Sequence, residues 1–289
     1  MLIALNAQCQ GSEHIKTARP CQDFTKAATN CWKTNAYAIV ADGHGGEKYF
    51  RSAEGSQLAV SSAAEEMSRL LGELLFYIKK KEKNVIDKSL KNLCSRILLL
   101  WQEKVKAHFS ENLLSEKELK LCKELKINIP LKEEDIFMLY GSTLLSSVYF
   151  ENYEFWFSIQ IGDGKTYILK EDGSAFSPKE LENEKAAFGV TPSLCGKNAI
   201  EEFRYAFGFE KIAGICVMSD GLTDSFDLNK LPDFLLSIKN NAIKNAEKTK
   251  TELEEYLPKL SEKGSGDDIS IAGIFVKEDG NKLMNILRK

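Results

Sequence analysis

The sequence lacks the features that mark membrane, secreted and nucleic-acid-binding proteins. No apolar run approaches the roughly 18 to 20 residues that a membrane-spanning helix needs. The start, MLIALNAQCQG, has no basic flank before its short apolar run, so we predict no secretion signal. The formal net charge of −3 indicates no basic surface for nucleic acid. We therefore expect a soluble, cytoplasmic protein that binds neither a membrane nor nucleic acid.

Cysteine, histidine and proline are also few or scattered. The seven cysteines form no Cys-x-x-Cys pair and no cluster with the three histidines, which argues against a zinc site. We predict that these cysteines are reduced and mostly buried, as is usual in cytosolic proteins. No Cys-x₅-Arg phosphate loop is present to supply a cysteine nucleophile. The six prolines and the lack of a low-complexity linker predict a single domain over residues 1–289.

What is present is a succession of strand-like and helix-like blocks. Apolar residues at helical spacing predict helices at 53–78, 85–109, 115–125, 231–243 and 246–260. Short apolar runs bounded by turn residues predict strands at 3–7, 36–41, 144–150, 155–161, 166–169, 212–218 and 269–276. Because strands and helices come in blocks rather than in alternation, we predict an α+β sandwich with antiparallel sheets and helices on their outer faces.

Four of the predicted strands carry an aspartate next to a glycine at one end. The stretches are VADGHGG at 40–46, IGDG at 161–164, SDGLTD at 219–224 and GDDIS at 266–270. One Asp-Gly pair alone usually marks only a turn, because Asp bonds its own backbone and Gly accepts a positive φ. Four such pairs, together with Asp23 in CQD, suggest that the strand ends converge and gather carboxylates in a small volume.

A carboxylate cluster of this kind predicts divalent cations. Like charges at close range raise the pKa of one or more carboxyls unless a cation compensates them, and oxygen ligands suit Mg²⁺ or Mn²⁺. Two ions bridged by one carboxylate would activate a water for in-line attack on a phosphoester. Gly43 has no Cβ, so its carbonyl can approach an ion. His44 is a candidate general acid for the departing alkoxide, although a histidine in a turn can also be purely structural.

With these motifs the sequence resembles the PP2C-type, metal-dependent protein serine/threonine phosphatases, and most closely their bacterial branch. The front motif G-x-x-H followed by P-x-Q-D corresponds to residues 11–14 and 20–23. VADGHGG, GSTLL at 141–145, IGDG, SDGLTD and GDDIS then follow in the family's order over nearly the whole chain. The resemblance implies a four-layer α-β-β-α sandwich, with two antiparallel sheets flanked by helices and a metal centre in a cleft at one end.

The resemblance also implies a reaction and a role for individual residues. Metal-activated water would hydrolyse phosphoserine and phosphothreonine in proteins directly, in a system with a cognate Ser/Thr kinase. His44 would act as the general acid. The implied ligands of two core Mg²⁺ or Mn²⁺ ions, and of a weaker third ion, are Asp42 as the bridging acid, the Gly43 carbonyl, Asp220, Asp267, Asp163, Asp224 and Asp23. Thr143 in GSTLL is interpreted as a buried structural threonine.

Two departures from the family pattern bear on activity. Gln22 stands where many members have a glutamate, and Ala18 stands where many have a phosphate-binding arginine, with Arg19 one residue later. Arg19, Lys16 and His14 are therefore the candidate phosphate contacts, although Lys16 and Arg19 also fit ordinary surface charge. The departures leave open a catalytically weak PP2C-fold module that regulates or binds phosphoproteins. A metal-dependent phosphodiesterase or nuclease has less support, because no basic and aromatic groove is indicated.

Three further predictions concern segments around this core. Residues 79–135 exceed a minimal phosphatase core and are predicted to be a helical elaboration that covers one sheet. Residues 188–209 are predicted to form a flap beside the active site, in which 191–198 contact the substrate peptide. His108, in the second long helix, is predicted to lie at the surface.

Overall fold

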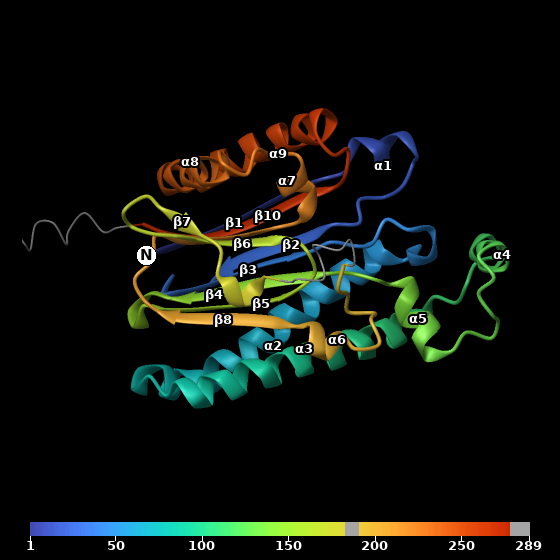
Figure 1. Ribbon diagram of the computed structural model, residues 1–289, viewed down its shortest axis with the longest axis horizontal. Coiled ribbons are helices and arrows are strands. Elements are labelled where there is room, and N and C mark those ends of the chain that lie inside the picture. Colours follow the sequence, from blue (N-terminus) through green and yellow to red (C-terminus); the bar gives the residue numbers. More distant parts are fainter. Residues whose placement is uncertain (183–190, 278–289) are drawn as a thin grey trace, which may run out of the picture.

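The computed structural model describes residues 1–182 and 191–277, and two five-stranded antiparallel sheets lie between two layers of helices in it (Figure 1). The first sheet has, in spatial order, β1 (Leu2–Cys9), β10 (Ile269–Val276), β9 (Gly214–Met218), β6 (Lys165–Leu169) and β7 (Ala175–Phe176). The second has β2 (Phe24–Thr29), β3 (Asn35–Ala41), β4 (Leu144–Phe150), β5 (Phe155–Ile161) and β8 (Arg204–Phe209). The predicted four-layer α+β sandwich is confirmed.

The central strand β3 shows why the central strands are apolar along their whole length. Successive side chains of a strand point to opposite faces of the sheet. Ala38 and Val40 therefore face the core between the two sheets, whereas Ile39 and Ala41 face the core under the helices of the second sheet. Because both faces of β3 are buried, the strand reads as a continuous apolar run instead of an alternating one.

Two pairs of helices form the outer layers. The helices α2 (Ser52–Lys80) and α3 (Lys83–Glu111) pack on the second sheet, and α8 (Leu231–Lys244) and α9 (Ala246–Lys263) pack on the first. Shorter helices are α1 (Ser12–Lys16), α4 (Glu116–Glu124), α5 (Glu133–Leu139), α6 (Ala199–Glu202) and α7 (Asp220–Asp224). In the part of the chain that the structure describes, no helix is long and apolar enough to cross a membrane.

The predicted long helices and central strands are confirmed within a few residues. The elements that were not predicted are edge strands of the two sheets and short helices. The structure adds the edge strands β2, β7 and β8 and the short helices α1, α5, α6 and α7. The prediction of a flap over 188–209 is wrong for 204–209, which form β8 and pair with β5. Residues 188–190 of that range, like 278–289, lie outside the described residues.

Two smaller predictions also need correction. His108 is half-buried rather than on the surface, because its Nδ1 lies 2.7 Å from the hydroxyl of Tyr140. The cysteines are all free, but only Cys94, Cys122 and Cys216 are fully buried, and Cys31 is exposed. The threonine prediction holds, since Thr143 is buried at the start of β4.

The strand ends that carry the aspartates meet at one end of the sandwich. In the second sheet Phe24 of β2 pairs with Ala41 of β3, so Asp23 and Asp42 flank the last paired residues. In the first sheet Met218 of β9 pairs with both Lys165 and Ile271, which brings the three aspartate-bearing turns of that sheet together. The fold thus places the acidic motifs of both sheets at the same edge.

Candidate active site

The carboxylates of Asp42 and Asp220 are in hydrogen-bonding contact, although they follow strands of different sheets. Burial, followed by the charges of Asp23 and Asp220, raises the pKa of Asp42 well above its usual value, and Asp267 adds to the effect. Burial also raises the pKa of Asp220 to about 6, with further contributions from Asp163, Asp267 and Asp224. Aspartates from separate motifs therefore form one cluster of interacting charges.

Asp23 is the most deeply buried acid of this cluster. Burial raises its pKa to about 8, although hydrogen bonds from the hydroxyls of Ser270 and Ser219 partly oppose the shift. The Ser270 hydroxyl donates to Oδ2 at 2.6 Å. Among the described residues, Oδ1 of Asp23 and Oδ1 of Asp220 are buried without a hydrogen-bond partner. A buried carboxylate oxygen without a partner is costly, so these atoms fit ligands of a hard divalent cation.

The loop after β3 is held by backbone contacts that fix the direction of Asp42. The Asp42 N–H donates to Thr143 Oγ1 at 3.0 Å, and the Thr143 N–H donates back to the Asp42 carbonyl at 2.8 Å. A Cβ at Gly43 would lie 2.6 Å from the carbonyl oxygen of Ser52 and 2.8 Å from that of Gln22. The position therefore requires glycine for packing, independently of any carbonyl contact with an ion.

His44 lies on the rim of the cluster. Its N–H donates to the Gly141 carbonyl at 3.1 Å, and its ring packs edge-on against Tyr49 with 4.7 Å between centroids. Burial lowers the pKa of His44, the charge of Asp163 raises it in part, and Lys48 lowers it further. The imidazole is thus fixed beside the carboxylates, in a position to exchange a proton with a group bound there.

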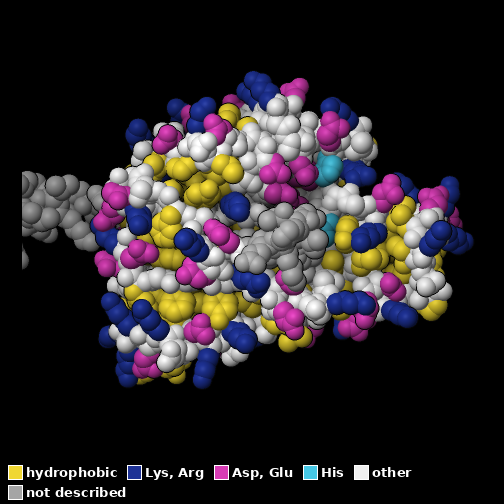
Figure 2. Space-filling model, in the orientation of Figure 1, with side chains coloured by type: hydrophobic (Ala, Val, Ile, Leu, Met, Phe, Trp, Pro, Cys, Tyr) yellow, Lys and Arg dark blue, Asp and Glu magenta, His cyan; other side chains and the backbone are white. Residues whose placement is uncertain are grey.

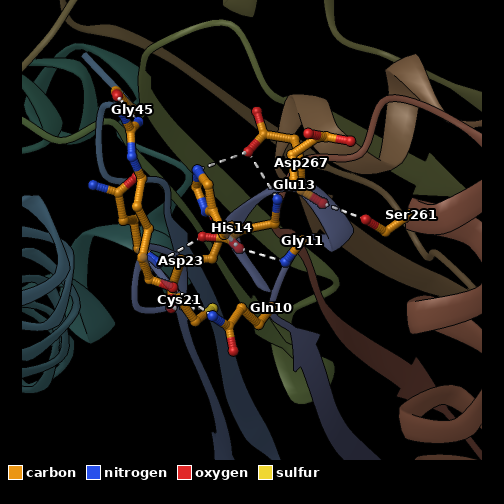
Figure 3. A network of polar contacts seen from close by, with 12 residues as sticks. Gln10, Gly11, Glu13, His14, Cys21, Asp23, Gly45, Ser261 and Asp267 are labelled. Atoms are coloured by element: carbon orange, nitrogen blue, oxygen red, sulfur yellow. Dashed lines mark hydrogen bonds and ion pairs between the residues drawn. The ribbon is translucent and has the colours of Figure 1, made fainter. Parts of the chain in front are cut away.

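A second group of residues joins the front of the chain to its end (Figure 3). The buried carboxylate of Asp268 accepts from the N–H of Gly11 at 2.6 Å and from the N–H of Gln22 at 2.5 Å. His14 Nδ1 lies 3.0 Å from Oδ1 of Asp268, and His14 Nε2 lies 3.9 Å from Oδ1 of Asp267. These three side chains place possible ligand atoms within 4.8 Å of one another.

Asp268 is not among the site residues predicted from the sequence. The DD pair at 267–268 could have predicted that the two acids lie in different environments, because adjacent residues that lead into a strand face opposite sides. Asp267 is exposed at the end of the sandwich, and Asp268 is buried under the 11–22 segment. The acids of GDDIS thus have different environments, one at the cluster and one inside the fold.

The three candidate phosphate contacts differ in their position relative to the carboxylate cluster. The guanidinium of Arg19 donates to the carbonyl of Gly45 at 2.6 Å, next to His44. Lys16 is exposed and pairs with Glu13 at 2.6 Å, and the nearby charge of Glu262 also acts on it. Arg19 and His14 therefore lie at the edge of the cluster, whereas Lys16 is engaged by surface acids.

Gln22, Thr191 and Leu194 make local contacts with the site. The amide nitrogen of Gln22 donates to the His44 carbonyl at 3.2 Å and to the hydroxyl of Ser52. The Thr191 hydroxyl donates to the carboxylate of Asp163. The N–H of Leu194 donates to the Ser142 carbonyl at 3.0 Å, which anchors this segment beside GSTLL. In Figure 2 acidic side chains gather beside a histidine in the upper part of this face.

Comparison with known proteins agrees with this architecture. A sequence model of the family described as Protein phosphatase 2C matches residues 10–258. A search of curated proteins found no match to the sequence.

The fold is similar to several solved structures at low sequence identity. One is the catalytic domain of the serine/threonine protein phosphatase PstP in complex with two manganese ions, with a TM-score of 0.57, 14% identity, and coverage of 96% of this chain and 99% of that one. The Mycobacterium tuberculosis serine/threonine phosphatase PstP/Ppp gives the same four values. PppA, a regulatory component of the T6SS in Pseudomonas aeruginosa, has a TM-score of 0.56, 14% identity, and coverage of 95% and 97%.

Proposed function

The chain belongs to the protein phosphatase 2C family, and from this premise we propose that it is a metal-dependent phosphatase for phosphoserine and phosphothreonine in proteins. The observation that carries the proposal is the contact between Asp42 and Asp220, with Asp23 and Asp267 close enough to raise the pKa of Asp42. Such a concentration of buried negative charge is unfavourable alone and favourable around divalent cations.

In this proposal the residues at the strand ends divide the ligand roles. Asp42, Asp220, Asp267 and the Gly43 carbonyl would hold two Mg²⁺ or Mn²⁺ ions. Asp163 and Asp224 with Asp220 would hold a third, more weakly bound ion, and Asp23 would be a further ligand from within the core. When bound, the ions would neutralise the phosphoryl charge and lower the pKa of the attacking water. The two manganese ions of the PstP structure support a centre with two ions.

The remaining steps belong to side chains of this protein. His44 donates a proton to the departing serine or threonine oxygen, since its backbone N–H is bonded to Gly141 and its imidazole packs against Tyr49 at the rim of the cluster. Arg19, beside Gly45, contacts the phosphate of the substrate, and His14 keeps Asp267 in place. Lys16, which is exposed and pairs with Glu13, is a further candidate contact for the phosphate.

We also propose that residues 1–289 form one phosphatase domain and that 79–135 are an elaboration on it. The substrate is a phosphorylated protein, and a Ser/Thr kinase supplies the phosphate group. The description of PppA as a regulatory component supports a role in signalling, and the cytoplasm remains the expected location.

The test is hydrolysis of p-nitrophenyl phosphate and of a phosphoserine peptide with Mn²⁺ or Mg²⁺. We expect turnover that EDTA abolishes, and a loss of at least about 100-fold in Asp42→Asn and in Asp267→Asn, since each removes a charged ligand. Asp233→Asn, on the exposed start of α8, is the matched control and should keep full activity. Turnover that EDTA leaves unchanged would overturn the proposal.

A second candidate is a phosphoprotein-binding module with little activity, and Gln22 favours it. The Gln22 amide, where many relatives carry an acid, bonds to His44 and Ser52 and supplies no charge to the cluster. Phosphopeptide binding without turnover at any divalent ion, in a folded protein, would favour this second function.

A further inference from the structure

A groove of about 570 Å³ lies directly beside the proposed active site. One of its walls contains Gly45 and Gln22, which are the neighbours of His44 and Asp23 in the chain. The opposite wall is the helix α4, within the helical elaboration. Figure 2 shows yellow apolar side chains between the histidine at the centre of this face and the protruding part of the molecule at its right edge.

The wall formed by α4 is fixed to the body of the protein. Arg51, which is buried where α2 begins, makes two hydrogen bonds with the carboxylate of Glu118, at 2.7 and 3.1 Å. The same guanidinium donates to the carbonyl of Asn112 and to the hydroxyl of Tyr140. A helix held in this way forms a defined second side of the groove instead of a loosely attached arm.

The floor of the groove is apolar and only partly covered. Phe50, Ala53 and Leu121 line it and are all half-buried. The cavity is large enough for one apolar side chain and part of a peptide backbone. An apolar side chain placed there would gain roughly 1.5 to 3 kcal/mol from burial before the costs of binding.

The rim of the groove favours an acidic partner. Arg19 and Lys117 lie on it, and both are exposed. The charge of Glu118 is compensated by Arg51, and Lys120 and Glu124 lie 4.0 Å apart as a pair. Glu47 is the remaining acid on this rim, so the cations prevail on the α4 side while the aspartates dominate the centre.

We propose that this groove binds the segment of the phosphoprotein substrate next to the phosphorylated residue, with an apolar side chain against Phe50 and Leu121 and an acidic side chain at Lys117. The inference rests on the proposed function, because the phosphorylated residue occupies the adjoining centre. An extended peptide advances about 3.3 Å per residue, and the groove adjoins the centre, so the contacting residues lie close to the phosphoserine in the peptide sequence. The elaboration thereby selects the substrate.

The experiment compares two fluorescein-labelled phosphoserine peptides that differ only near the phosphoserine. One carries leucine and aspartate within four positions on either side, and the other carries alanine and lysine there. Binding is measured by fluorescence anisotropy in EDTA, and kcat/KM with Mn²⁺. We expect the first peptide to bind and react about tenfold better, which corresponds to about 1.4 kcal/mol.

The variants Leu121→Asp and Lys117→Glu should each remove most of this preference and leave p-nitrophenyl phosphate turnover unchanged. Lys123→Glu, on the same helix but outside the groove, is the matched control. Equal binding of both peptides to the wild type, or an unchanged preference in both variants, would overturn the groove assignment. Failure to hydrolyse p-nitrophenyl phosphate would instead count against the phosphatase function, and the anisotropy in EDTA would still decide the groove.

Discussion

The adjacent acids Asp267 and Asp268 lie in different environments, because they lead into β10 and successive side chains face opposite sides. Asp267 is exposed at the carboxylate cluster, and Asp268 is buried, where it accepts hydrogen bonds from Gly11 and Gln22. The buried acid fixes the segment that carries Asp23. A motif read as one feature therefore contains a candidate ligand and a structural residue, and only their environments distinguish the two.

His44 provides a prediction at the scale of one residue. In His44→Ala the hydrolysis of a phosphoserine peptide should fall by about 100-fold or more, since general acid catalysis is typically worth that much. Hydrolysis of p-nitrophenyl phosphate should fall far less, because nitrophenolate leaves without protonation. Steady-state kinetics with both substrates is the measurement, and circular dichroism verifies folding. Equal losses on the two substrates would contradict a role in acid catalysis.

At the scale of one element, α4 depends on few contacts with the rest of the protein. Burial raises the pKa of Glu118, but hydrogen bonds from Arg51 and Ser115 outweigh it and hold the pKa at about 2, below the ordinary 4.5. A group whose pKa is lower in the folded state stabilises the fold above its unfolded pKa. This contribution is therefore complete above pH 4.5 and is lost as the pH falls toward 2.

We predict that Glu118→Gln lowers the free energy of unfolding at pH 7 by about 1 to 2 kcal/mol, a value reduced for the partial exposure of the pair. The difference from wild type should shrink between pH 4.5 and 2. Urea denaturation at several pH values measures it. Glu116→Gln, in the exposed first turn of the same helix, is the control and should change stability little. A difference that stays constant with pH would contradict the ion pair.

The edge strand β8 is an element that could not be predicted from its local sequence. Its residues RYAFGF are the last six of the stretch 188–209, whose Gly and Pro content predicts a flap. Phe155 pairs with Phe209 and Ser158 with Ala206, so β5 provides the partner that stabilises the strand. Edge strands depend on this long-range pairing more than on their own composition, and the local sequence carried too little information to identify one.

At the scale of the whole molecule, the cluster joins the two sheets. Asp23 precedes β2 and Asp42 follows β3 of the second sheet, and Asp220 follows β9 of the first. Without cations, the burial of these carboxylates and their mutual repulsion oppose the packing of these strand ends. Divalent ions that bind the folded state alone would therefore stabilise the entire sandwich.

We predict that saturating Mn²⁺ raises the melting temperature of EDTA-treated protein by about 5 °C or more, since ligand at 100 times its Kd contributes about 2.7 kcal/mol. In Asp42→Asn the metal-free protein should melt higher than metal-free wild type, and the gain with Mn²⁺ should shrink. Differential scanning calorimetry measures both, and Asp233→Asn should respond to Mn²⁺ as wild type does. A lower metal-free melting temperature in Asp42→Asn would contradict the repulsion.

The sequence by itself determined the fold class, the long helices and the existence of a carboxylate site. Periodicity in α2, α3, α8 and α9 and the apolar runs of the central strands are local properties, so no partner was needed to read them. The Asp-Gly motifs at several strand ends pointed to one acidic centre, and the structure brings Asp42 and Asp220 together there.

Only the tertiary structure decided which of the acids Asp267 and Asp268 faces the centre and which is buried. It also decided where the basic side chains of the 11–22 segment lie, and that α4 borders a groove beside His44. These features arise between residues far apart in the chain, such as Gly11 with Asp268 and Arg51 with Glu118. Their physical reason is packing: the register of paired strands and the docking of α4 set these distances, and composition and spacing do not encode them.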